Sequence, residues 1–541
     1  MDSKLLRGTF ILTIGTYISR ILGMIYVFPF VALVGEDGTA LFSYGYAQYT
    51  IFLGIATMGF PMAVSKFVAK YNELGDYHTS RRLFKSGLLV MSVTGFIAFI
   101  LLFLLAPYIA PVVLGGDKHA NTVEDVTMVI RMVSVALIAV PIMSIIRGFF
   151  QGNQSMGPTA VSQVIEQLVR VIFLLSASYI VIKVVDGQMA TAVGFATFAA
   201  FIGALGGLVV LLVYLKKRKP YFDELLENSR PQTELRTKDM YKELLSYAGP
   251  FVFVALAIPL YNYVDNFTFN KAMTSIGLGD ITENVIGMIT FSIPKLVMIP
   301  VSLATAFGMT LIPTITSSFT SGNYSLLRNQ IDQTFQVILF LVLPAVVGLS
   351  VLAYPTFSTF YSANELGGQI LRWFAPVAIL FSFYTVTAAI LQGINKQKLA
   401  VISLVLGLFV KIITNTPLIY VFEGFGSIIA TALGFAVSIA YNFWMIAKHT
   451  KYTFSLFVRR SVLMGIFAAI MALSLILVQW LFSFSITYDQ GKTQSTAILL
   501  VCVVVGAIVY LYLAYKSHLL SKLLGKRFAF LSRKKRRQNN S

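Results

Sequence analysis

The chain has 541 residues, of which 57% are hydrophobic and 12% are charged, and its mean hydropathy is +0.78. A soluble protein could not bury so much apolar surface, and the long apolar runs lack the alternation of β-barrel strands. Composition therefore predicts an all-α polytopic membrane protein. The net charge of +19 lies mainly between the apolar runs, so we attribute it to membrane topology and expect no nucleic-acid binding.

The apolar runs predict fourteen transmembrane helices, near residues 9–34, 41–67, 86–113, 126–150, 159–182, 189–215, 245–270, 285–316, 331–361, 370–393, 399–422, 426–447, 461–484 and 495–515. If both termini are cytoplasmic, most of the 42 Lys and Arg residues face inward. The outer loops then hold four lysines: Lys118, Lys183, Lys271 and Lys492. This asymmetry predicts a multi-pass plasma-membrane protein with both termini in the cytoplasm.

Several charged residues fall inside the predicted spans of the first half. Arg20 lies about halfway along the first span, and Glu166 and Arg170 lie near the middle of the fifth. Glu166 and Arg170 are one helical turn apart and can pair. Lys66, near the inner end of the second span, is either an interfacial anchor that reaches water or a cavity residue. Charges at mid-membrane depth are costly and suggest function.

The second half carries its own set of intramembrane charges. Asp265 lies in the seventh span, and Lys295 lies in the eighth among Pro294, Pro300 and Pro313. We expect those prolines to interrupt the eighth helix where it lines a cavity or packs on protein. Lys411 lies in the eleventh span.

The two halves repeat one another. The segment RGFFQGNQSMGPTAVSQVIEQLVRVI begins at Arg147, and its second part is echoed 241 residues later in LQGINKQKLAVISLVLGLFVKII from Leu391. In this register Arg170 corresponds to Lys411, whereas Glu166 corresponds to Gly407. Six helices in each half make the repeat parallel, which predicts two lobes with a site between them.

The repeat predicts a division of the chain into five parts. These are a first lobe (1–215), a cytoplasmic linker (216–244), a second lobe (245–447), two additional helices (448–515) and a basic tail (516–541). We expect the tail to rest on the anionic lipids of the inner leaflet.

The chain has no nucleotide-binding or catalytic motif, and its one cysteine, Cys502, excludes an intramolecular disulfide. We therefore expect a transporter rather than an enzyme, without a cofactor, and leave ion-gradient and membrane-potential coupling open. The intramembrane cations outnumber the carboxylates, which favours an anionic diphosphate head group as ligand. The alternative is that Glu166–Arg170 and Asp265–Lys411 are structural locks. Tyr26 would add a hydrogen bond or a sugar contact.

The motifs SRILG, GFPMAVSKFVA and RGFFQGNQSMGPTAVSQVIEQLVRV, together with the layout of twice six helices plus two, resemble the MurJ-type lipid II flippases. The resemblance covers nearly the whole chain and is strongest to the Gram-positive branch of YtgP and stage V sporulation protein B (SpoVB). It implies the fold of the multidrug/oligosaccharidyl-lipid/polysaccharide (MOP) exporters, which includes the MATE transporters. It also implies alternating access and transfer of an undecaprenyl-diphosphate-linked peptidoglycan precursor to the outer leaflet.

The resemblance also suggests roles for particular residues. Arg20 matches the arginine of the family's first-helix motif and is expected to contact substrate. Other cavity arginines of Gram-negative members correspond here to Tyr26 and to an apolar position near Phe52, so the phosphate clamp must differ. A sodium site like that of some members would use Asp265, Asn415 and Thr431, although the Lys411 ammonium could take the cation's place.

The sequence and the resemblance leave three predicted functions open. The first is a lipid II flippase of the bacterial plasma membrane, expected to be monomeric. The second is a flippase for another undecaprenyl-linked glycan, such as a teichoic acid or capsule unit. The third is a non-transporting scaffold or regulator of cell-wall assembly.

Overall fold

The computed structural model describes residues 15–16, 18–57, 60–115, 120–229, 249–250 and 252–519, with side chains at 62, 63, 66, 303, 305–314 and 317 excepted. Every regular element in these ranges is a helix. Twelve described helical stretches are long and apolar enough to cross a membrane, as judged by length and composition. The prediction of an all-α polytopic architecture is confirmed.

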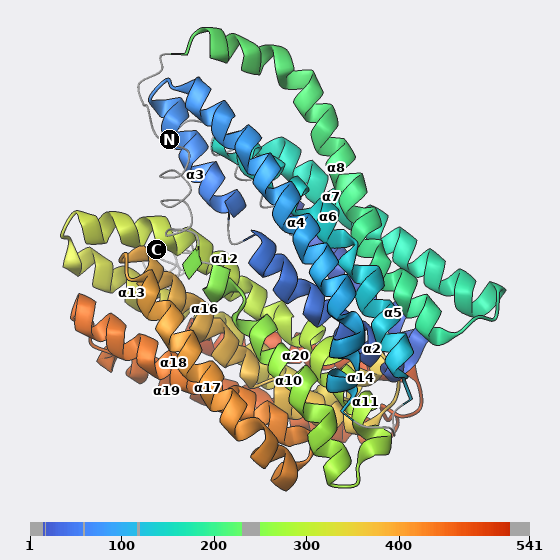
Figure 1. The fold of residues 1–541 in the computed structure, drawn as a ribbon. Helices are drawn as coiled ribbons and strands as arrows, with labels where there is room; N and C mark the ends of the chain where they lie inside the picture. Colours follow the sequence, from blue (N-terminus) through green and yellow to red (C-terminus); the bar gives the residue numbers. More distant parts are fainter. Residues whose placement is uncertain are drawn as a thin grey trace, which may run out of the picture. The chain divides into compact units, whose positions relative to one another are not determined.

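The chain forms two compact units, and the first comprises residues 1–292 and 415–424. Its elements are α2 (Val27–Thr57), α3 (Phe60–Glu73), α4 (Tyr77–Leu114), α5 (Val123–Ser134), α6 (Ala136–Gly152), α7 (Met156–Tyr179), the π-helical turn η1 (Ile180–Val184), α8 (Met189–Glu227), α10 (Ala257–Ser275), α11 (Gly279–Gly287) and the π-helical turn η2 (Met288–Ser292). Figure 1 shows α4 to α8 of this unit running alongside one another. A buried apolar cluster that includes Phe60, Leu83, Ile145 and Phe150 joins α3, α4, α6 and α8.

The first predicted span, from Ile18 on, and most of the second lie in one helical stretch, Ile18–Thr57, and the end of the second span lies in α3. The expected break between them occurs at Gly35, whose φ of 69° and ψ of −176° are not helical. Glycine tolerates this backbone conformation because it has no Cβ. A turn at Gly75 and Asp76 leads into α4: Gly75 has a φ of 73°, and the Asp76 carboxylate accepts a hydrogen bond from the Thr79 amide to cap the helix.

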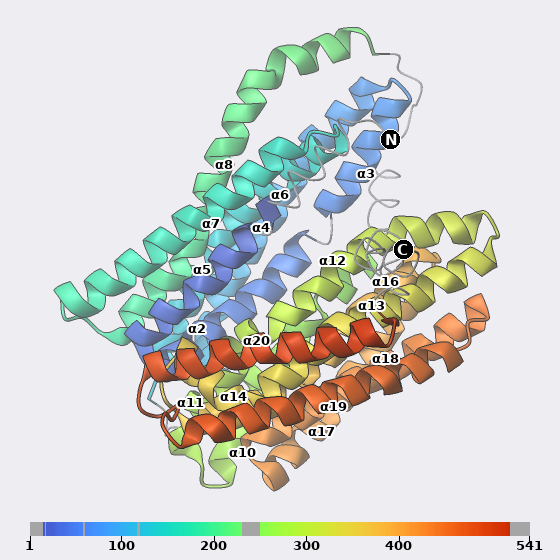
Figure 2. The ribbon, with the colours of Figure 1, turned by 180° about the vertical axis from the view of Figure 1, so that it is seen from behind.

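The second unit comprises residues 293–414 and 425–541. Its elements are α12 (Ile293–Thr320), α13 (Tyr324–Val351), α14 (Ala353–Phe360), α15 (Glu365–Phe374), α16 (Val377–Gly393), α17 (Gln397–Phe422, of which Asn415 onward belongs to the first unit), α18 (Gly424–Thr450, from Phe425), α19 (Ser455–Ser483) and α20 (Lys492–Lys516). Figure 2 shows α19 and α20 side by side. α12 continues past Pro294, Pro300 and Pro313, so the expected interruption there is wrong; the irregular turn is η2, just before α12.

The repeat seen in the sequence is also a repeat of elements. α6 (Ala136–Gly152) and α16 (Val377–Gly393) have bounds that differ by 241 positions, and so do the starts of α7 and α17. The turns between the helices match as well: Gln154 and Asn395, 241 positions apart, have φ values of 55° and 58°. The α6–α7 hairpin and the α16–α17 hairpin therefore repeat the same local structure. The predicted lobes, 1–215 and 245–447, are defined by this sequence repeat. The two compact units are defined by contacts between residues and have different bounds. The division into lobes therefore stays a prediction.

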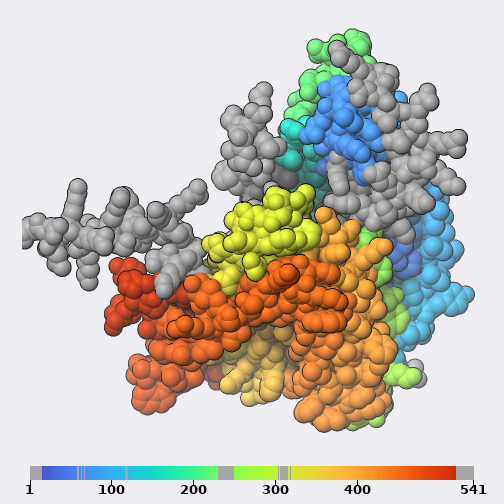
Figure 3. Space-filling model, turned by 90° about the vertical axis from the view of Figure 1, so that its left-hand side faces the viewer, coloured from blue at the N-terminus to red at the C-terminus, as the bar shows by residue number. Residues whose placement is uncertain are grey.

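The exposed surface of the last helices of the second unit is apolar. Figure 3 shows α18 and α19, in orange, covering a continuous face. Large exposed side chains on α19 include Val462, Leu473 and Trp480. Such a surface suits contact with lipid. Cys502 in α20 is fully buried. Residues 520–541, most of the predicted basic tail, lie outside the described residues.

Candidate substrate site

The site of the first unit is built on one polar stripe of α7. Polar side chains recur there every three or four residues, so they share one side of the helix. The stripe consists of Thr159, Ser162, Gln163, Glu166, Gln167 and Arg170. Because the other residues of α7 up to Leu175 are apolar, this stripe defines where a polar ligand would meet that part of the helix.

Glu166 pairs with a different arginine from the one predicted. Its Oε2 atom lies 2.7 Å from Nη2 of Arg147, which extends from α6. The Arg147 guanidinium also donates from Nε to the Ser162 hydroxyl at 2.8 Å. The predicted Glu166–Arg170 pair is therefore wrong. Four-residue spacing allows such a pair, but the facing helix supplies an arginine that binds both Glu166 and Ser162.

Arg170 points to α2 instead. Its Nη1 donates to the Tyr46 hydroxyl at 3.2 Å, and the guanidinium carbon lies 5.2 Å from the centre of the Tyr46 ring. Tyr46 packs in turn on Phe42 and Tyr49. The Arg170 Nε is buried without a hydrogen-bond partner among the described residues. A cation held by an aromatic ring with one donor unused can accept an anionic group.

Two glycines of α8 allow α7 to approach at this level. A Cβ added at Gly203 would lie 2.7 Å from the Arg170 Cβ and 2.8 Å from the Glu166 carbonyl oxygen. A Cβ at Gly207 would lie 3.2 Å from the Glu166 Cβ and 3.3 Å from Nη2 of Arg147. The two glycines are four residues apart and so share one helix face. Their small size lets α8 support the charged residues from behind.

The helical residues 18–25 and the two described residues before them lie against the same stripe. The Thr16 hydroxyl donates to Gln163 at 3.1 Å, and a Cβ at Gly23 would lie 3.1 Å from the Gln167 amide nitrogen. Arg20 is half-buried in this segment, and no described carboxylate lies within 4.0 Å of its guanidinium. Tyr26, at the end of the segment, is 4% exposed. The structure thus brings the segment that carries Arg20 and Tyr26 to α7.

Asp265 of α10 is also buried in the first unit. One of its carboxylate oxygens accepts from the Asn415 amide at 3.0 Å, and the same amide donates to the Thr268 hydroxyl at 2.7 Å. Asp265 and Asn415, two of the three residues predicted for an ion or lock site, are therefore in direct contact. Within the described part of the chain, no three His, Cys, Asp or Glu side chains gather as metal ligands would.

Lys411 of α17 is fully buried in the second unit. Its ammonium donates to the Thr431 hydroxyl at 2.9 Å and to the Ser427 carbonyl oxygen at 3.0 Å, both on α18. Thr431, the third residue of the predicted ion site, thus binds a lysine ammonium. Lys295 is half-buried at the start of α12, and the side chain of Lys66 lies outside those described.

Two residues of this site were missed by the sequence analysis or given little weight. Arg147 stands in the RGFFQG motif but was treated as the end of a helix, so its charge was not placed in the membrane. Tyr46 was one of several tyrosines with no pattern to single it out. The position of Arg147 four residues before Gln151 could have revealed it, because the helix has more than one turn left after the arginine.

Comparison with known proteins gives three findings. Residues 5–319 match the polysaccharide biosynthesis protein family. The chain is 57% identical over 541 residues to the lipid II flippase MurJ of Bacillus subtilis (strain 168), covering 99% of each chain. Its fold is similar to that of a solved lipid II flippase MurJ in an inward closed conformation, with a TM-score of 0.64 at 15% identity and coverage of 95% of this chain and 99% of that one.

The fold is also similar to an inward-facing multidrug resistance MATE family transporter of the MOP superfamily. That likeness has a TM-score of 0.63 at 16% identity and covers 81% of this chain and 98% of the transporter. The expected MATE-like fold is therefore confirmed, and the long apolar helices are those of a multi-pass membrane protein.

Proposed function

This chain belongs to the family of the MurJ lipid II flippases, and from that membership we propose that it moves lipid II from the inner to the outer leaflet of the bacterial plasma membrane. The observation that carries the proposal is the 57% identity to the Bacillus subtilis flippase over the full length of both chains. Members of this family are membrane transporters, so the chain is a transporter and not an enzyme.

The charges of the site suit the proposed substrate. A diphosphate joins the lipid to the sugar in an undecaprenyl-linked precursor, and it needs cations inside the membrane. Arg170 offers a guanidinium with an unused donor, and Arg20 lies on a segment packed against the same helix. We assign diphosphate contacts to Arg20 and Arg170, with Tyr26 beside them; contacts of Lys66, Lys295 and Lys411 with the substrate remain predictions. Bidentate arginine contacts favour phosphate oxygens.

Glu166 has a different role in this scheme. Because Arg147 neutralises it, Glu166 does not compete for Arg170 and does not repel the diphosphate. The Arg147–Glu166 pair instead holds α6 and α7 together behind the cation. Arg170 is then left available to the substrate.

The proposal also covers the orientation of the chain in the membrane, its oligomeric state and the energy source of transport. Both termini lie in the cytoplasm according to the distribution of lysine and arginine, which places the α6–α7 turn on the cytoplasmic side. The chain acts as a monomer, with its basic tail on anionic lipids. Transport depends on an ion gradient, the membrane potential or substrate supply, and Asp265 with Asn415 forms either an ion site or a lock between helices.

The test is replacement of the host's own lipid II flippases by this chain. Cells that depend on it should grow, and lipid II should reach a membrane-impermeant probe outside the cell. Arg20→Ala should abolish both growth and probe labelling at unchanged membrane levels. The matched control is Arg131→Ala, because Arg131 contacts the Phe103 ring and carbonyl and lies outside the α7 stripe.

Two outcomes would contradict the proposal. If depletion causes a different undecaprenyl-linked glycan to accumulate inside while lipid II moves normally, the substrate is that glycan. If Arg20→Ala supports growth while loss of the tail from 520 onward does not, the chain acts as a scaffold.

A further inference from the structure

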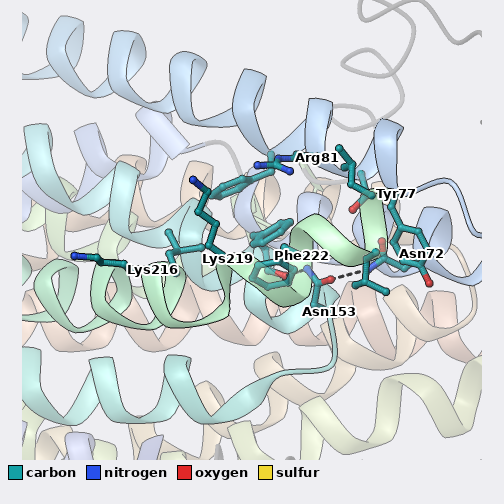
Figure 4. Close-up of a pocket in the computed structure, with 13 residues that line it drawn as sticks. Asn72, Tyr77, Arg81, Asn153, Lys216, Lys219 and Phe222 are labelled. Atoms are coloured by element: carbon teal, nitrogen blue, oxygen red, sulfur yellow. Dashed lines mark hydrogen bonds between the residues drawn. The ribbon is translucent and has the colours of Figure 1, made fainter. Parts of the chain in front are cut away.

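A cavity of about 340 Å³ lies in the first unit beside the ends of α3, α6 and α8 and the start of α4. Figure 4 shows the residues around it. Its lining combines cationic side chains, aromatic rings and two asparagines: Asn72, Tyr77, Ser80, Arg81, Phe84, Phe149, Asn153, Leu215, Lys216, Lys219, Phe222, Leu225 and Leu226. None of the residues assigned above to substrate lines it.

The cavity exists because α8 continues beyond its apolar run. That run ends at Leu215, and the helix continues through KKRKPYFDELLE to Glu227. Asp223 of this extension pairs with Arg81 of α4 at 2.7 Å. Arg218 donates to the Ser155 hydroxyl in the α6–α7 turn, with its guanidinium 5.9 Å from the Phe150 ring. The extension is therefore fixed to both neighbouring hairpins, and it forms one wall of the cavity.

The floor of the cavity is aromatic. The Phe84 and Phe149 rings stack with centroids 4.1 Å apart, and Phe222 packs on Phe149 at 5.2 Å. The Asn72 amide donates to Asn153 at 2.9 Å and joins α3 to the turn after α6. These contacts give the cavity a preformed apolar wall, which is typical of sites for small amphiphilic ligands.

The rim of the cavity is cationic. Arg81 and Lys219 reach over the rings from α4 and α8, and Lys216 lines the cavity with its ammonium directed away from the other labelled side chains (Figure 4). Arg81 is partly neutralised by Asp223, so the two lysines are the excess positive charge of the lining. Phosphate is the anion that such a lysine and arginine pair recognises.

We propose that this cavity binds the phosphate of an amphiphile, namely the head group and upper acyl chain of an anionic phospholipid of the inner leaflet. The lysines follow directly on the apolar run of α8, where the helix would leave the membrane and meet lipid phosphates. The aromatic floor gives the acyl chain an apolar surface, which a free phosphate ester would not use. The proposal rests on the proposed orientation, but it does not depend on flipping.

The test uses the full chain in detergent, titrated with phosphatidylglycerol or phosphatidylcholine and followed by native mass spectrometry. One saturable phosphatidylglycerol site is expected, with weaker phosphatidylcholine binding. Lys216→Gln with Lys219→Gln should weaken phosphatidylglycerol binding by at least about fivefold, as expected from the loss of one or two surface cations. The matched control is Lys85→Gln with Lys217→Gln, which removes the same charge from exposed positions outside the lining. Its affinity should change less than about twofold.

Equal weakening in both double variants would overturn the proposal, because it would show only a general attraction to a basic surface. Displacement of the lipid by inorganic phosphate or glycerol 3-phosphate at comparable concentration would overturn the lipid source and assign the site to a soluble phosphate ester. Failure here is separable from failure of the proposed function. Chains with the cavity lysines replaced should still be tested for lipid II flipping, and a chain that flips without binding phosphatidylglycerol contradicts this site alone.

Discussion

Arg147 and Glu166 join α6 to α7 through an ion pair with 2.7 Å between Nη2 and Oε2. Their side chains are 14% and 23% exposed, so the pair is largely shielded from water. Ser162 accepts a hydrogen bond from the same guanidinium. The pair is thus the main polar link of the hairpin that presents Arg170.

The first prediction concerns the strength of this link. Glu166→Gln or Arg147→Gln alone should lower the free energy of unfolding by about 1–3 kcal/mol, because each leaves one partner uncompensated in a partly buried place. The double variant should recover part of that loss, since neither charge then remains. Thermal unfolding in detergent measures all three, and simple additivity of the two single losses would contradict the pairing.

The second prediction concerns Arg170. Arg170→Gln should reach the membrane but lose most transport, because it removes the cation assigned to the diphosphate. Arg170→Lys should keep part of the activity, since it retains charge but loses the planar fork. Tyr46→Phe is the matched control, because it keeps the ring under the guanidinium and removes the hydroxyl that Arg170 contacts. Growth of flippase-depleted cells reports the result, and full growth with Arg170→Gln would remove this residue from the site.

The third prediction concerns packing at Gly203. Gly203→Ala should destabilise the protein by about 1–3 kcal/mol, because the new methyl would lie 2.8 Å from the Glu166 carbonyl oxygen, which is fixed backbone. Gly465→Ala adds the same methyl to α19 with nothing within 4 Å. That control should be neutral or slightly stabilising, because alanine favours a helix over glycine. Equal melting temperatures for the two variants would show that α7 and α8 can separate at no cost.

The fourth prediction concerns Lys411 and sodium. Because its ammonium already contacts Thr431 and Ser427, flipping in proteoliposomes should not change when sodium is replaced by choline. Lys411→Met should lower the free energy of unfolding by about 2–3 kcal/mol, since the buried oxygens lose their donor. A clear sodium requirement of the unmodified chain would contradict the idea that the lysine takes the place of a cation.

The sequence was a good guide to where membrane helices lie and a poorer one to where helices end. The predicted span at 189–215 corresponds to α8, which continues to Glu227, and the span at 86–113 corresponds to α4, which begins at Tyr77. Apolar runs report the thickness of the membrane, whereas a helix continues as long as its backbone bonds and tertiary contacts permit. The α8 extension, which covers the cavity, was therefore predicted as a linker.

Side-chain partners were harder to predict than helices. Spacing along one helix suggested Glu166 with Arg170, but the choice depends on which neighbouring helix supplies a competing group. Arg147 and Tyr46 supplied those groups here. No sequence pattern indicated the hydroxyl and carbonyl oxygens of α18 that Lys411 binds. The 241-residue repeat, by contrast, was readable because it preserves a turn.

Because the protein has a single cysteine, introduced cysteines can be labelled with thiol reagents with little interference. Cys502 is fully buried in α20, so the folded chain should react slowly with a bulky maleimide. A cysteine placed at exposed Asn228 or at exposed Asp489 would then be the reactive thiol of its variant. With an impermeant reagent on intact cells, Asp489→Cys should label from outside and Asn228→Cys only after permeabilisation. The reverse pattern would show that the orientation is opposite to the one proposed. Because Cys502 is buried and unreactive, single added cysteines can report on which side of the membrane a loop lies.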